Sequence, residues 1–227
     1  MPTVHVRGEL GNNEGTMLNN PAARKVSAVV IDPVARLLLA LRISPDAVTV
    51  VGTTGACVGA LVFFPRGDFL MGVLIIVIFI ASDLLDGTMA RISGRAGPWG
   101  NFLDATLDRI ADGSIFGGLL LWAAFTQNGW VTAAALISLV GGQVISYAKA
   151  RAEAVGATAN VGLAERAERL IIGLGAALLA GLGVPYVLPA ALIVLAVLTL
   201  VTIGQRLWHV RGQLKSRQPP AATDELA

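Results

Sequence analysis

Charged residues and cysteines are both scarce in this sequence. Only 14% of the 227 residues are charged and 55% are hydrophobic, and the mean hydropathy is +0.70. A soluble domain usually carries about 25% charged residues, so this composition indicates an integral membrane protein. The single cysteine, Cys57, lies inside an apolar run, which excludes a disulfide framework and a cysteine-based metal site.

The two ends of the chain are polar. Residues 1–23 lack the apolar core and the small-residue cleavage site of a signal peptide, and we expect them to form a flexible N-terminal tail. Residues 212–227 are polar and contain proline, and we expect a disordered cytoplasmic tail there. Between these tails, residues 24–211 are predicted to form one membrane domain.

The apolar residues are grouped into long runs. A helix needs roughly 20 residues to cross the hydrocarbon core of a bilayer, and six segments meet this requirement: 46–64, 69–90, 101–126, 130–154, 163–183 and 185–208. Residues 24–42 alternate apolar residues with Arg and Lys at helical spacing, which is typical of a helix lying on the membrane surface. We therefore predict an all-α, six-transmembrane-helix polytopic membrane protein with an N-terminal interfacial amphipathic helix.

Positive charge is confined to one end of these spans. Among the 17 Lys and Arg residues, only Arg66 falls in the loops at 65–68, 126–129 and 182–186. Because cytoplasmic loops carry the excess of Lys and Arg, the side of the membrane opposite these three loops is predicted to be cytoplasmic. Both termini then lie in the cytoplasm, and we expect a multi-pass protein of the plasma membrane.

Aspartates break the apolar pattern at the cytoplasmic ends of the second and third spans. Asp83 and Asp86 are three residues apart on one helix, and Asp104 and Asp108 are four residues apart on the next, so each pair shares a helix face. The linker between the two helices is short, which makes them antiparallel neighbours with both pairs facing one gap. Carboxylates at membrane depth are costly and usually functional.

Four carboxylates in one gap require neutralisation by cations. Oxygen-only ligands suit a hard cation such as Mg²⁺, Mn²⁺ or Ca²⁺ rather than zinc, and a pair of such ions suits phosphoryl transfer. Gly87 and Ala90 continue the Asp83 stripe and leave a slot for a ligand, and Arg91 at its end can neutralise a phosphate. Asp112 lies one turn beyond Asp108, and for this residue we favour a structural role.

The spacing Asp83-x2-Asp86-Gly87-x2-Ala90-Arg91-x8-Gly100-x3-Asp104-x3-Asp108 resembles the complete signature of the CDP-alcohol phosphotransferase family. This resemblance implies an enzyme that moves a substituted phosphate from a CDP-linked donor to an alcohol and releases CMP. It further implies two Mg²⁺ or Mn²⁺ ions, with Asp83, Asp86 and Asp104 as ligands. Asp108 would be the base that deprotonates the acceptor hydroxyl and a ligand of the second ion. A homodimer is expected as well.

The segment at 43–52 resembles the part of the family that helps to bind the nucleotide. The resemblance implies that Pro45, Asp46 and Thr49 bind CDP-diacylglycerol beside Gly87, Ala90 and Arg91. For Ser44, Pro45 and Asp46, a second interpretation is that they only begin a helix, with Ser44 as its N-cap.

Five polar residues near the cytoplasmic face are candidates for binding the acceptor: Ser146, Lys149, Arg166, Arg169 and Arg206. Arg166 and Arg169 share a helix face and could grip a phosphate as a fork. Alternatively, these basic side chains only snorkel, which means that they extend to place their charged groups in the water at the membrane surface. The stretches SYxKARxE and RAER resemble the actinobacterial branch of the family that makes phosphatidylinositol phosphate from CDP-diacylglycerol and inositol 1-phosphate. A phosphatidylglycerolphosphate synthase, which uses glycerol 3-phosphate, is the alternative.

Two other classes of membrane protein remain open at this point. A secondary transporter would spread its carboxylates across the membrane, whereas here they cluster at one end. A structural scaffold would leave the costly aspartates unexplained. The partners we expect are the two substrates, membrane lipid and a second copy of the chain, but no nucleic acid.

Overall fold

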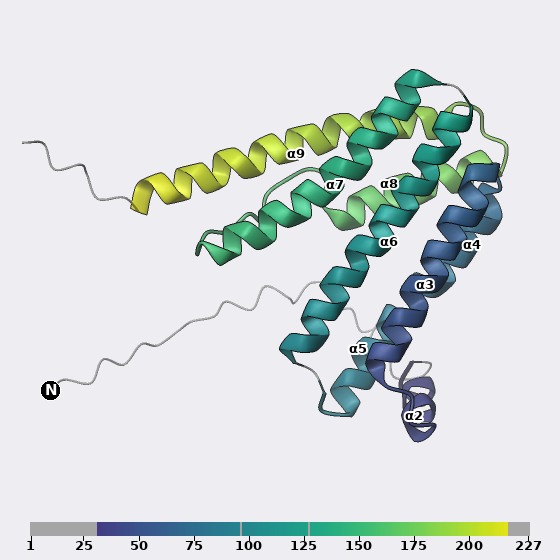
Figure 1. Cartoon of the computed structure of the whole chain (residues 1–227), viewed down its shortest axis with the longest axis vertical. Coiled ribbons are helices and arrows are strands. Elements are labelled where there is room, and N and C mark those ends of the chain that lie inside the picture. Colours follow the sequence, from purple (N-terminus) through teal and green to yellow (C-terminus); the bar gives the residue numbers. More distant parts are fainter. Residues whose placement is uncertain (1–30, 96, 127, 218–227) are drawn as a thin grey trace, which may run out of the picture.

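The computed structural model describes residues 31–95, 97–126 and 128–217, and every regular element in these residues is a helix. The elements are α2 (Asp32–Ala40), α3 (Pro45–Phe63), η2 (Phe64–Arg66), α4 (Phe69–Ile80), α5 (Asp83–Ile92), α6 (Pro98–Phe125), α7 (Gly129–Ala154), α8 (Arg166–Gly181) and α9 (Val187–Arg217). The long helices run alternately in opposite directions, and α2 and α5 lie together at one end (Figure 1). The predicted all-α class is confirmed.

Four helical segments are long and apolar enough to cross a membrane: Pro45–Arg66, Phe69–Ile92, Gly129–Ala154 and Val187–Arg217. Two of the six predicted spans fall short of that standard. In α6 the charged residues Asp108, Arg109 and Asp112 reach into the middle of the helix, and α8 has only 16 residues. The chain is thus a membrane protein whose polar site intrudes into helices that would otherwise be apolar.

Local sequence signals explain where most helices begin. The Ser44 side chain accepts a hydrogen bond from the Ala47 backbone N–H at 3.2 Å, and Pro45 occupies the first turn of α3, as predicted for an N-cap followed by proline. Pro98 likewise begins α6. Of the predicted interfacial helix, residues 24–30 lie outside the described residues, while α2 covers 32–40 and packs against α5.

The second predicted span, 69–90, is interrupted rather than continuous. A turn at Ala81 and Ser82 separates α4 from α5. The Ser82 hydroxyl donates to the carbonyl of Phe79 at 2.5 Å, and such hydroxyl bonds compete with the helical backbone pattern and bend helices. As a result, Asp83 and Asp86 occupy the first turn of a separate short helix.

The last helix is longer than expected. It continues to Arg217 and includes residues 212–217, which we assigned to the disordered tail. Residues 218–227 lie outside the described part of the chain. Figure 1 shows this end of α9 extending beyond its neighbours.

The apolar core lies around α6, which packs against α3 and α7. Large buried side chains fill it, among them Phe64, Ile76, Phe116, Leu119, Leu192 and Leu195. Gly118 allows α6 to approach the backbone of α3 closely, because a Cβ atom at this position would lie 2.5 Å from the Ala60 carbonyl oxygen of α3. This core holds the first turns of α3 and α6 beside α5, which is where the polar residues gather.

Candidate active site

A cleft of about 580 Å³ opens between the start of α3, α5 and the first half of α6. It is lined by every residue that we assigned to the metal ions and the donor: Pro45, Asp46, Thr49, Asp83, Asp86, Gly87, Ala90, Arg91, Asp104 and Asp108. The two aspartate pairs therefore border one space, although they come from different helices.

The carboxylates of α5 differ in exposure. Asp86 is only 8% exposed, and its Oδ2 atom is buried without a hydrogen-bond partner among the described residues. Asp83 is half-buried one turn earlier, on the same side of the cleft. A buried carboxylate oxygen without a partner is costly unless a cation or donor reaches it, so Asp86 is suited to binding a cation.

Glycines give the ligand room to approach. Cβ atoms placed on Gly87 and Gly100 would meet nothing within 4 Å, and both residues line the cleft. Arg91 lies beside this open surface and donates from Nη2 to the Thr88 hydroxyl at 3.0 Å. The predicted slot is therefore present as open space.

Sequence reasoning missed one contact of the cleft. The indole Nε1 of Trp99 donates to Asp46 Oδ2 at 3.0 Å, and the Trp99 ring packs near that of Phe102. Trp99 stands in the variable stretch of the signature, next to Gly100. A tryptophan there is a visible signal, but its partner lies 53 positions away, and spacing alone does not identify such a partner.

A second cleft, of about 620 Å³, lies between α6, α7, the start of α8 and α9. Of the five residues assigned to the acceptor, four line it: Ser146, Lys149, Arg166 and Arg206. Ser146 accepts a hydrogen bond from Arg109 Nη1 and donates to the Gly142 carbonyl. Arg206 is almost fully buried, and it donates to Ile145 O at 2.7 Å and to Glu165 Oε1 at 3.1 Å.

Arg169 departs from the prediction. It is 1% exposed and lies behind the second cleft, where Nη1 donates to Gly142 O at 3.2 Å and Nη2 lies 3.4 Å from Asp112 Oδ2. Arg166 and Arg169 therefore do not form a fork toward a phosphate. The reason is the buried Asp112 carboxylate, which attracts both guanidinium groups from the protein side and has the structural role we favoured for it.

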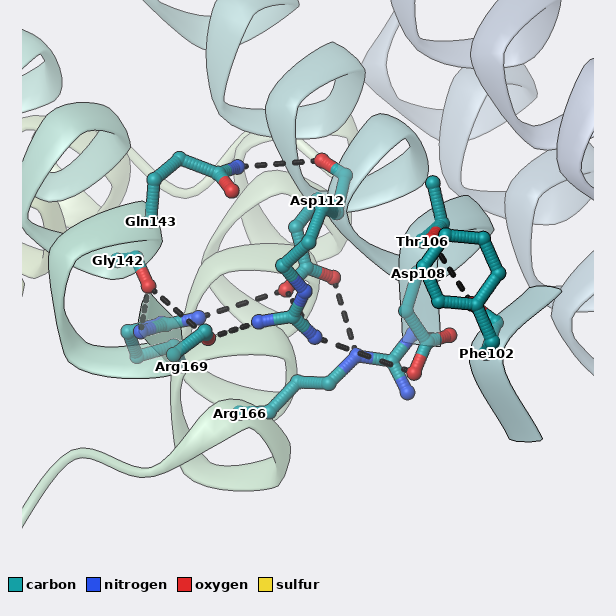
Figure 2. A network of polar contacts seen from close by, with 10 residues as sticks. Phe102, Thr106, Asp108, Asp112, Gly142, Gln143, Arg166 and Arg169 are labelled. Atoms are coloured by element: carbon teal, nitrogen blue, oxygen red, sulfur yellow. Dashed lines mark hydrogen bonds and ion pairs between the residues drawn. The ribbon is translucent and has the colours of Figure 1, made fainter. Parts of the chain in front are cut away.

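The two clefts share three lining residues: Asp104, Asp108 and Arg166. At this junction Arg166 Nη2 lies 2.6 Å from Asp108 Oδ1, and Arg166 Nε donates to Asp112 Oδ1 at 3.2 Å. Figure 2 shows Arg166 reaching from α8 toward both carboxylates of α6. A donor in one cleft and an acceptor in the other would thus meet at the same two aspartates.

The residues of the first cleft fit a hard divalent cation. Asp83, Asp86, Asp104 and Asp108 offer only oxygen ligands, and Asp86 brings an unpartnered buried oxygen. Over residues 31–95, 97–126 and 128–217, no three Asp, Glu, His or Cys side chains lie close enough together to ligate one ion. Asp108 instead pairs with Arg166.

Comparison with known proteins agrees with this geometry. Residues 42–203 match the family model for CDP-alcohol phosphatidyltransferase. The phosphatidylinositol phosphate synthase of Streptomyces avermitilis is 48% identical over 217 residues, which cover 92% of this chain and 88% of that protein. The enzyme of the same name from Mycobacterium marinum is 46% identical over 213 residues, covering 90% and 86%.

Solved structures give the same relationship. The Mycobacterium tuberculosis phosphatidylinositol phosphate synthase with CDP-DAG bound is 42% identical, superimposes with a TM-score of 0.78, and is matched over 87% of this chain and 98% of that chain. The same enzyme in complex with manganese and citrate also has a TM-score of 0.78, with 87% and 94% covered. The chain with these two adjoining clefts therefore belongs to the CDP-alcohol phosphatidyltransferase family of phospholipid-synthesising enzymes.

Proposed function

We propose that this chain transfers the phosphatidyl group of CDP-diacylglycerol to inositol 1-phosphate, forming phosphatidylinositol phosphate and CMP. The observation that carries the proposal is the junction of the two clefts at Asp104, Asp108 and Arg166. The names of the relatives and the bound CDP-DAG in one of them support the same reaction.

The donor occupies the first cleft in this proposal. Pro45, Asp46 and Thr49 bind the nucleotide from α3, and Gly87 and Ala90 let the pyrophosphate approach α5 closely. Arg91, at the end of this open surface, pairs with the phosphate of the departing CMP. The two acyl chains stay in the lipid next to the cleft.

Asp83, Asp86, Asp104 and Asp108 would hold the metal ions, which we propose to be two Mg²⁺ or Mn²⁺. When bound, these ions supply positive charge to the pyrophosphate oxygens and to the leaving group. A relative in complex with manganese supports a divalent ion in this family. The four carboxylates in turn keep the ions on the donor side of the junction.

The chemical step is a direct displacement. Asp108 accepts the proton of the inositol hydroxyl, and that oxygen forms a bond to the β-phosphorus, which carries the diacylglycerol. The bond between this phosphorus and the bridging oxygen breaks, and CMP leaves with the bonding electrons. Asp108 suits this role because it borders both clefts.

The acceptor phosphate binds in the second cleft. Lys149, Ser146, Arg166 and Arg206 line this space, and their three positive charges suit a phosphorylated alcohol better than a neutral one. Arg169 does not line this cleft, and it contributes indirectly by holding Asp112 in an ion pair. This distribution replaces the fork of Arg166 and Arg169 that the sequence predicted.

We also propose how the chain is placed in the plasma membrane. The segments α3, α4–α5, α6, α7, α8 and α9 cross it, and α2 lies on its cytoplasmic surface. Both clefts open toward the cytoplasm, where the termini also lie, and residues 24–211 form the membrane domain. The enzyme acts as a homodimer.

An acceptor panel tests the proposed reaction. Purified enzyme receives CDP-diacylglycerol labelled in its phosphatidyl group, with inositol 1-phosphate, glycerol 3-phosphate or free inositol, each with and without Mg²⁺. We expect labelled phosphatidylinositol phosphate only with inositol 1-phosphate and Mg²⁺. Preferred transfer to glycerol 3-phosphate would identify a phosphatidylglycerolphosphate synthase and refute the proposal.

A further inference from the structure

Asp112 lies outside the family signature and yet is the most densely paired carboxylate near the site. Its side chain is 3% exposed. Oδ1 accepts from Arg166 Nε at 3.2 Å, while Oδ2 lies 3.4 Å from Arg169 Nη2 and 3.5 Å from Arg109 Nη2. Three guanidinium groups thus fix one buried carboxylate.

Arg166 connects this fixed carboxylate to a second, half-buried one, that of Asp108. Its Nε atom faces Asp112, and its Nη2 atom lies 2.6 Å from Asp108 Oδ1. The Asp108 side chain is 17% exposed and borders both clefts, and the Arg166 side chain is 33% exposed. Figure 2 shows the Arg166 side chain spanning the distance between the two aspartates.

The contact of Arg166 with Asp112 is fixed, whereas its contact with Asp108 can be replaced. Asp112 cannot turn away, because Arg169 is itself buried and also bonded to Gly142 O. Moreover, a Cβ at Gly142 would lie 3.0 Å from Arg169 Cζ, so the helix backbone closes off this side. Asp108 instead faces open space, where a phosphate could replace it as the partner of Nη2.

We propose that Asp112 is a positioning residue on which Arg166 pivots, and that Arg166 exchanges Asp108 for the acceptor phosphate. When no acceptor is bound, Arg166 forms an ion pair with Asp108. When the phosphate enters the second cleft, it takes over Nη2, and Asp108 becomes free for the divalent ion and for the hydroxyl proton. This inference rests on the proposed function, because it uses the roles given there to Asp108 and the acceptor.

Titration of Mn²⁺ into the purified protein tests the exchange without turnover. In the wild type, inositol 1-phosphate should tighten Mn²⁺ binding roughly 5- to 150-fold, the usual range of coupling between two sites. The Arg166→Gln variant should bind Mn²⁺ tightly without acceptor, and adding inositol 1-phosphate should not tighten Mn²⁺ binding further. Unchanged Mn²⁺ affinity in the wild type on adding inositol 1-phosphate would overturn the proposal.

Lys149→Gln is the matched control. Lys149 is exposed in the same cleft, carries the same charge, and pairs with no carboxylate among the residues that the structure describes. Its Mn²⁺ affinity without acceptor should equal that of the wild type. If Lys149→Gln tightens Mn²⁺ binding as much as Arg166→Gln does, the effect is general electrostatics and the exchange is refuted.

Kinetics test the positioning role of Asp112. The Asp112→Asn variant keeps the shape of the side chain but weakens its ion pair with Arg166. The Arg166→Lys variant keeps the positive charge, but a lysine cannot hold two carboxylates with one planar group. Both should raise the KM for inositol 1-phosphate about tenfold or more and leave the KM for CDP-diacylglycerol unchanged. If the Asp112→Asn variant does not fold, the KM values of the Arg166→Lys variant alone test the positioning role. Equal changes in both KM values, or an unchanged acceptor KM, would contradict the role.

The two proposals can fail separately. Coupling between Mn²⁺ and inositol 1-phosphate without formation of phosphatidylinositol phosphate would refute the proposed function and keep the exchange. Product formation without coupling would refute the exchange and keep the function.

Discussion

Replacing Gly87 with alanine should weaken the binding of CDP-diacylglycerol without destabilising the fold. A Cβ at Gly87 meets no protein atom within 4 Å, and alanine is favoured over glycine inside a helix by about 0.5–1 kcal/mol. The added methyl group enters the space where we place the pyrophosphate. Overpacking of a fitted site costs about 1–3 kcal/mol, and because about 1.4 kcal/mol corresponds to a tenfold change, donor affinity should fall roughly 5- to 150-fold.

The assay combines the KM for CDP-diacylglycerol in mixed micelles with the melting temperature of the purified protein. Gly175→Ala in α8 is the matched control, because its Cβ also meets nothing within 4 Å and Gly175 lies outside the cleft. It should keep the wild-type KM. A wild-type donor KM in Gly87→Ala would refute the placement of the donor, and a clearly lower melting temperature would show that Gly87 packs against protein.

Three further predictions concern packing, ligands and stereochemistry. Gly118→Ala should lower the free energy of unfolding by about 1–3 kcal/mol, seen as a lower melting temperature, because its Cβ would lie 2.5 Å from the Ala60 carbonyl oxygen. Gly117→Ala, whose nearest contact would be at 4.0 Å, should melt like the wild type, and equal melting of both variants would contradict the packing argument. Asp104→Asn should abolish CMP release, and near-normal turnover in the folded variant would remove Asp104 from the ligand set. A donor made chiral at the β-phosphorus should give a product of inverted configuration, whereas net retention would require a covalent intermediate.

Much of the fold and of the first cleft could be predicted from the sequence because the signals are local. Apolar runs of membrane length gave the long helices, and the Ser44–Pro45 pair predicted the start of α3. The aspartate pairs could be placed together because helical spacing fixes a face and a short linker fixes neighbouring helices.

What the sequence could not predict depends on contacts between distant positions. The turn before Asp83 results from a serine hydroxyl bond that hydropathy does not register. Arg169 was expected in the acceptor cleft because it shares a face with Arg166, but the buried Asp112, 57 positions away, binds it instead. Helical spacing identifies which side chains share a face and leaves open what that face meets.

The most direct test of the reaction is a simultaneous measurement of CMP and phosphatidylinositol phosphate formed by the purified enzyme. We predict that both products appear in equal amounts, only when CDP-diacylglycerol, inositol 1-phosphate and Mg²⁺ are all present, and that Asp108→Asn forms neither. CMP release without an acceptor, or undiminished transfer by Asp108→Asn, would contradict a displacement in which Asp108 activates the acceptor hydroxyl.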